Sequence, residues 1–243
     1  KDKPRSKLFE FWRVRLEYAG RATHPPAVPI AVVLLIAAFF GLLVRIPETF
    51  LTNIWYYPRF APFFTILSVS TYFLFKRPDR PLTMGLVIFS ILTSLYLSLL
   101  PDWQSSDSVN MALIHLPLTT LALLGLCFVH HEWRETEQRI AFIRLCGELL
   151  ILGTLILIGG GVLTAFALGL FSLMGVDVDE WYIENFGVIG MVSTPLVAAY
   201  LYDSILKRQL HITVLLAKIF SPLFCIFVFS YLTVMMVEGH NPF

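Results

Sequence analysis

The sequence predicts an all-α integral membrane protein with about seven transmembrane helices and a cytoplasmic N-terminus. Two features of the composition indicate this class: hydrophobic residues fill 57% of the 243 positions, and charged residues only 14%. A soluble domain of this size would carry more charge on its surface. The third feature is the length of the apolar segments, because a helix needs roughly 20 mostly apolar residues to cross a bilayer.

The first element is a cytoplasmic amphipathic segment at residues 1–26. Its charged residues recur at helical spacing opposite Leu8, Trp12 and Leu16, a pattern typical of a helix in the headgroup layer. A solvated helix packed on the protein itself would give the same pattern. Residues 27–243 then form a polytopic transmembrane domain, with predicted spans near 28–44, 58–75, 82–100, 109–129, 149–172, 186–202 and 212–237.

The connectors between these spans alternate in charge. Lysine and arginine gather before the first span and in the second, fourth and sixth connectors, whereas the other connectors hold only Arg45 and Arg59. Cytoplasmic loops of membrane proteins carry such an excess of positive charge, so the pattern predicts seven crossings with the N-terminus inside. A second amphipathic stretch, residues 131–145, is expected to be continuous with the fifth span.

Three consecutive glycines, Gly159, Gly160 and Gly161, lie in the middle of the fifth span. They match neither a phosphate-binding loop nor a dinucleotide fingerprint, because the flanking motif residues are missing. Gly161, Ala165 and Gly169 recur every four residues, which favours close helix packing in lipid. A break in the helix near the bilayer midplane, as in transporter binding sites, is the alternative.

Prolines interrupt three other spans, at Pro117, Pro195 and Pro222. Each removes one helical hydrogen bond, and each has a nearby Ser, Thr or His that could satisfy the freed carbonyl. The prolines are expected to kink the packed helices, or, in the alternative interpretation, to line a cavity.

Four ionisable side chains fall at membrane depth: His115, Glu148, Asp203 and Lys218. Such groups are costly in lipid and are functional candidates for that reason. Lys218 could pair with Glu148 or Asp203, or it could snorkel while the two carboxylates stay at the interface. His115 is expected to pack or to bond a carbonyl, with a proton relay as the alternative.

The sequence predicts neither a metal site nor a cofactor. Cys127, His130, His131 and Glu135 cluster in the sequence, but no HExxH or related motif accompanies them. The three cysteines are isolated, and no nucleophile elbow is present. The net charge of +1 gives no basic footprint for nucleic acid. These absences make an enzyme the third choice among functions.

The last third of the chain resembles a family of bacterial multi-pass inner-membrane proteins that is known only as a domain of unknown function. The likeness covers residues 179–239: an acidic and aromatic loop leads into a Gly-containing helix, and a later helix opens with a Lys-Ile-Phe segment and Pro-Leu. The resemblance implies a location in the bacterial cytoplasmic (inner) membrane and further helices beyond this segment, but no activity. Its matching residues are Glu180, Tyr182, Asn185, Gly187, Lys218, Phe220, Pro222 and Leu223.

Two functions remain open on the sequence alone. A permease-like or transport-associated protein is favoured by the glycines, the prolines and the ionisable groups at depth. A non-transporting envelope scaffold, assembly factor or sensory module is the alternative. The expected partners are the lipid bilayer, a membrane protein or a second copy of this chain, and an unidentified small solute. The chain is also expected to be part of a longer protein, because it begins at Lys1 and stops just after an apolar segment.

Overall fold

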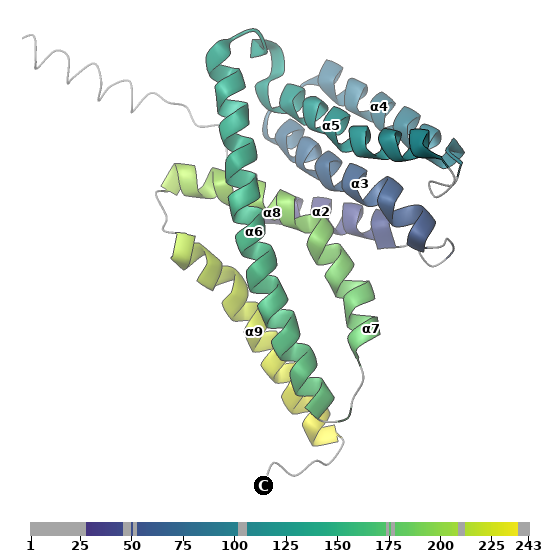
Figure 1. Cartoon of the computed structure of the whole chain (residues 1–243). Helices are drawn as coiled ribbons and strands as arrows, with labels where there is room; N and C mark the ends of the chain where they lie inside the picture. The colour runs from purple at the N-terminus through teal and green to yellow at the C-terminus, as the bar shows by residue number, and fades with distance from the viewer. Residues whose placement is uncertain are drawn as a thin grey trace, which may run out of the picture.

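The structure is a computed structural model that describes residues 28–45, 50, 53–101, 106–173, 175, 178–208 and 212–237. The predicted amphipathic segment at residues 1–26 lies outside these ranges. All regular structure within them is helical (Figure 1). The elements are α2 (Ile30–Arg45), α3 (Asn53–Lys76), α4 (Arg80–Leu99), α5 (Asp107–Val129), η3 (His130–Glu132), α6 (Thr136–Leu173), α7 (Asp179–Tyr182), η4 (Ile183–Gly187), α8 (Val188–Arg208) and α9 (Ile212–Val237).

Each of the seven predicted spans is helical. Four stretches of the described chain are long and apolar enough to cross a membrane, which indicates a membrane-embedded protein: Arg80–Leu99, Asp107–Glu132, Thr136–Ser172 and Asp179–Asp203. Helix α2 is shorter, at 16 residues. Helix α3 begins at Asn53, five residues before the predicted boundary at 58, and contains Pro58 and Pro62.

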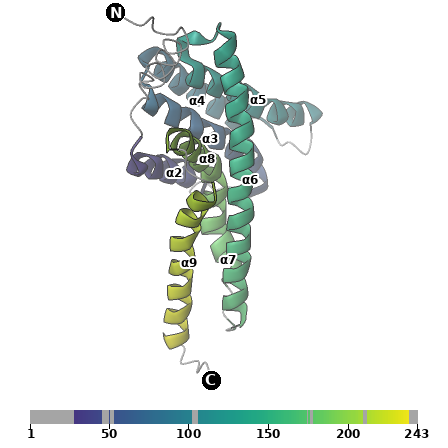
Figure 2. The ribbon, with the colours of Figure 1, turned by 90° about the vertical axis from the view of Figure 1, so that its left-hand side faces the viewer.

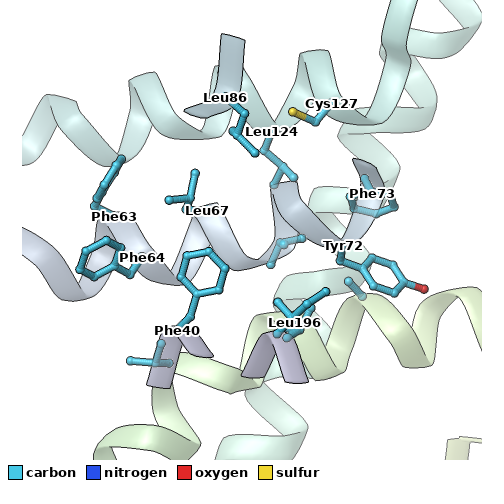
Figure 3. Packing of buried hydrophobic residues seen from close by; sticks show 14 of the residues in the cluster. Phe40, Phe63, Phe64, Leu67, Tyr72, Phe73, Leu86, Leu124, Cys127 and Leu196 are labelled. Carbon is cyan, nitrogen blue, oxygen red and sulfur yellow. The ribbon is translucent and has the colours of Figure 1, made fainter. Parts of the chain in front are cut away.

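Helix α3 lies at the centre of the molecule. Figure 3 shows Phe63, Leu67 and Phe73 of α3 between Leu124 of α5 on one side and Leu196 of α8 on the other. Helix α4 covers α3 from the side of α5, and α2 covers it from the side of α8. The space between the two outer layers is therefore filled by the side chains of α3, many of them aromatic.

Helices α2 to α5 alternate in direction. At one end of α3 the hydroxyl of Tyr56 donates to the carbonyl of Leu43 in the last turn of α2, at 2.6 Å. At the opposite end, His130 after α5 contacts the carbonyl of Arg77 just before α4. Up-and-down order is what the alternating charge of the connectors predicts for this part of the chain.

Helices α6 and α9 run across the direction of α2 to α5, as both Figure 1 and Figure 2 show. The arrangement thus differs from a bundle in which all seven predicted spans are parallel. Helix α6 has 38 residues, which makes it about 57 Å long at 1.5 Å per residue. It includes most of the predicted amphipathic stretch 131–145, so the expected continuity with the fifth span is confirmed.

The stretch from α7 to α8 is one continuous helix with a widened turn. The residues of η4 form a π-helix, in which the N–H of Val188 bonds the carbonyl of Ile183. Figure 1 shows α8 changing direction along its length, and Pro195 is the proline inside that helix. A proline inside a helix is a common cause of a kink. The first part of α8 packs on α2, where Ile189 lies against Gly41.

Candidate functional site

A buried ion pair joins α3 to α8. The ammonium of Lys76 lies 2.5 Å from Oδ1 of Asp203, and the side chains are only 14% and 12% exposed. The hydroxyl of Tyr72 donates to Oδ2 of the same carboxylate at 2.6 Å. Tyr72 and Lys76 are four residues apart, so they lie on one face of α3 and reach the carboxylate together. Each carboxylate oxygen thus has a donor, which is what a buried charge requires.

A second set of contacts fixes the turn that follows α3. The imidazole Nε2 of His130 lies 2.9 Å from the carbonyl of Arg77, and Nδ1 lies 3.3 Å from the carbonyl of Phe128. Carbonyls only accept, so a neutral ring can donate to just one of them, whereas a protonated ring donates to both. His130 also has a φ of 57°, a left-handed conformation that costs energy outside glycine.

The carboxylate of Asp79 contacts both the first turn of α4 and a histidine. Its Oδ1 accepts the N–H of Leu82 at 3.3 Å, which caps the N-terminus of α4. Its Oδ2 lies 2.8 Å from Nε2 of His131. Next to it, the guanidinium of Arg77 lies 3.9 Å from the carboxylate of Glu132. We refer to this set of side chains as the Lys76 cluster: Tyr72, Lys76, Arg77, Asp79, His130, His131, Glu132 and Asp203.

The hydrogen bonds and ion pairs of the Lys76 cluster join the ends of several helices. Its acidic, basic and histidine groups bond one another or the backbone, and they bring together the ends of α3, α5 and α8 with the start of α4. Within the described residues no group of His, Cys, Asp and Glu side chains could hold a metal ion. Of the four residues that cluster in the sequence at Cys127, His130, His131 and Glu135, His130 contacts backbone carbonyls and His131 contacts Asp79.

The other end of α3 is held by a buried arginine. Arg59 is fully buried, and its guanidinium donates to the carbonyls of Leu97, Leu100 and Pro101 at 2.7–3.0 Å. These carbonyls end α4, where four groups lack helical partners. The same guanidinium lies 4.4 Å from the ring centroid of Trp55. Arg59 belongs to α3, whereas the sequence analysis had placed it in a connector.

The glycine triplet lies inside a continuous helix, because α6 runs unbroken from Thr136 to Leu173. The interpretation as a helix break is therefore wrong for this structure. A Cβ at Gly159 would lie 2.6 Å from the ring of Phe220 in α9, whereas nothing lies within 4 Å of one at Gly160 or Gly161. Close packing occurs at Gly159, and the predicted stripe of Gly161, Ala165 and Gly169 is exposed.

The hydroxyls and imidazoles near the prolines bond other carbonyls than those predicted. Pro117 leaves the carbonyl of Leu113 without its helical partner, but His115 bonds the carbonyl of Met111 at 2.7 Å. Pro195 likewise frees the carbonyl of Met191, whereas Thr194 bonds that of Gly190 at 2.8 Å. Side chains reach back one full turn from their own position, which is where these acceptors lie. Pro222 lies inside α9.

The structure describes the side chains of three of the four ionisable candidates, His115, Glu148 and Asp203. His115 is exposed and bonds a carbonyl of its own helix, as expected. Both oxygens of Asp203 are engaged by α3, through Tyr72 and Lys76. The side chain of Lys218 lies outside the described part of the structure. Glu148 is half-buried in α6, close enough to Tyr202 to interact electrostatically with it.

Sequence reasoning missed Tyr72 and Lys76 as site residues. Lys76 was counted only among the basic residues of a connector, since Arg77 follows it directly. The available signal was the spacing of Tyr72 and Lys76 by one turn at the end of an apolar helix. Nothing in the sequence indicated that their partner would be 127 positions from Lys76.

Comparisons of the chain with family models, curated proteins and solved structures found no match. The resemblance to the family of unknown function therefore stays a prediction. Any function has to be inferred from the geometry alone.

Proposed function

We propose that this chain is a non-transporting, multi-pass membrane module that acts as a scaffold for a partner protein. The observation that carries the proposal is the position of α3: it fills the centre of the molecule and is held at both ends, by Arg59 and by the Lys76 cluster. Alternating access requires one group of helices to rock against another around a central site. A central helix fixed at both ends opposes such motion.

The same arrangement supports a cytoplasmic location for the Lys76 end. Lys76, Arg77, Arg80 and Arg134 gather there around the turn from α3 to α4 and the turn from α5 to α6. Cytoplasmic loops carry such an excess of Lys and Arg. An N-terminus inside and a bacterial inner membrane remain the preferred orientation and location, whereas seven upright crossings do not fit α6 and α9, which run across the direction of α2 to α5. The exposed basic side chains of this end are the face offered to a partner.

A photo-crosslinking amino acid at position 80 tests the scaffold. Arg80 is exposed at the start of α4, and Ile91 is exposed farther along the same helix, where it would face lipid. We expect one discrete protein adduct from position 80 in native membranes and none from position 91. Equal labelling at both positions, or no adduct at position 80, would contradict a partner at this end.

A permease-like function is the second candidate, and the buried Lys76–Asp203 pair favours it. Ionisable groups between membrane helices often form ion or proton pathways. The full chain in liposomes, under an imposed potassium diffusion potential, is to be assayed with an internal pH-sensitive dye. We expect proton flux equal to that of empty liposomes. Flux above that level, lost in Asp203→Asn, would replace the scaffold by a transporter.

A further inference from the structure

Helix α6 exposes an apolar stripe that continues toward its N-terminus. Ile140, Ile143 and Leu150 are 53%, 70% and 72% exposed. Ile143 follows Ile140 by three residues and Leu150 follows Ile143 by seven, so the three side chains lie on one face of the helix. The opposite face is packed: Leu145 is fully buried, and Phe142 lies against Gly125 of α5. The stripe therefore faces away from the rest of the described protein.

Two arginines flank this stripe. Arg139 and Arg144 are both exposed, and at 100° per residue they lie on either side of Ile140. Arg139 donates to the hydroxyl of Thr136 at 3.2 Å. The carboxylates of Glu135 and Glu137 lie nearer the start of the helix. Along the axis the acidic groups come first and then the arginines; Glu148 follows Arg144 by one turn, and residues 149–172 carry no charge.

An aromatic residue lies just before this part of α6. Trp133 is 52% exposed, and the guanidinium of Arg134 lies 4.9 Å from its ring centroid. Tryptophans with one apolar and one polar side are enriched at the membrane–water interface. Trp133 and the start of the stripe therefore have the same preferred environment.

The start of α6 lies beside the Lys76 cluster, because η3 directly precedes it and His130 contacts the carbonyl of Arg77. Helix α6 runs across the direction of α2 to α5. Where those helices cross the bilayer, the first turns of α6 therefore lie along its surface, as an interfacial helix does.

We propose that residues 133–151 bind anionic phospholipid at the cytoplasmic surface, with Arg139 and Arg144 on the headgroup phosphates and the stripe against the acyl chains. Guanidinium groups form paired, charge-assisted hydrogen bonds to phosphate. An exposed apolar stripe flanked by arginines is complementary to a layer with acyl chains below and negative charge above. The inference rests on the membrane location within the proposed function and not on the scaffold role.

Native mass spectrometry of the purified full chain tests the site, with phosphatidylglycerol and phosphatidylcholine as probes. We expect tighter binding of phosphatidylglycerol, weakened about 5-fold by Arg139→Gln or Arg144→Gln alone and about 30-fold by both, since each arginine that contacts the phosphate of the bound lipid contributes about one such factor. Arg80→Gln is the matched control, because it removes the same charge from an exposed position away from the stripe; we expect less than a 2-fold change.

Photoactivatable phosphatidylglycerol gives a second measurement. We expect its cross-links within residues 136–151, and their persistence when excess inorganic phosphate is added, because the acyl chains contribute to binding. Unchanged lipid binding in the double variant, equal affinity for phosphatidylcholine, or a dimer in which a second copy shields the stripe would each overturn the proposal. Failure to recover the chain in the membrane fraction would instead overturn the membrane location itself.

Discussion

Replacing Gly159 by alanine measures how closely α6 and α9 pack. The added Cβ would lie 2.6 Å from Cζ and 2.8 Å from Cε2 of Phe220, well inside van der Waals contact, so the ring or α9 has to move. Such overpacking costs about 1–3 kcal/mol. Alanine in place of glycine in a helix offsets roughly 1 kcal/mol of this. We expect a net loss of up to about 2 kcal/mol in the free energy of unfolding.

Gly161→Ala is the matched control on the same helix. Nothing lies within 4 Å of its new Cβ, so only the gain in helix propensity remains, and the variant is expected to be neutral or more stable. The propensity gain is common to both substitutions and cancels in their difference. The difference of about 1–3 kcal/mol therefore reports the contact with Phe220 alone. In a chain of this size, each kcal/mol corresponds to about 2–4 °C in Tm.

Thermal unfolding in detergent, followed by circular dichroism, compares the two variants. Phe220→Leu removes the ring edge, so it should restore most of the stability lost in Gly159→Ala and leave Gly161→Ala unaffected. Equal shifts for Gly159→Ala and Gly161→Ala would refute the contact with α9. A loss confined to Gly161→Ala, with weaker self-association, would instead show that the exposed stripe packs on a second copy.

Three further substitutions probe the ends and edges of α3 and α2. Asp203→Asn leaves the ammonium of Lys76 without its charge partner and should lower the free energy of unfolding by about 3 kcal/mol. The double variant Lys76→Met and Asp203→Leu should recover most of this loss in the same thermal melt. Equal losses in the single and the double variant would contradict a buried pair. Arg59→Lys loses the planar fork that reaches three carbonyls and should cost about 2 kcal/mol, seen as a lower midpoint in chemical unfolding; an unchanged midpoint would show that the fork is not needed. Gly41→Ala places a Cβ 2.8 Å from Ile189 and should destabilise by about 1 kcal/mol, whereas Gly85→Ala meets nothing within 4 Å and should not; pulse proteolysis compares the two, and equal cleavage would speak against the α2–α8 contact.

Helix positions were predictable because apolar length and connector charge depend only on local sequence. The boundaries of α4, α5 and α9 agree with the predicted spans to within two residues. Helix α3 was harder, since Pro58, Arg59 and Pro62 interrupt its apolar pattern. Its first turns are helical because tertiary contacts stabilise a charge that lipid would not solvate: the guanidinium of Arg59 donates to carbonyls at the end of α4.

The candidate site was predictable only in part. Asp203 stood out as a carboxylate at the end of a span, but its partners Tyr72 and Lys76 come from a helix more than a hundred residues away. Spacing along one helix indicates which side chains share a face, and it carries no information on which helix packs there. The crossing of α6 over α2 to α5 is hidden for the same reason.

Helix α6 stays continuous through the three glycines because a break in the helix would cost more free energy. Three glycines weaken a helix by roughly 3 kcal/mol in water relative to alanine. A break in lipid would instead leave several N–H and carbonyl groups without partners, each at a cost of several kcal/mol. The membrane therefore retains a helix that water would fray, unless a polar cavity replaces the lost bonds. Gly159, Gly160 and Gly161 do not interrupt α6. Gly159 gives α9 room to approach, and Gly161 leaves a shallow surface on the side away from it.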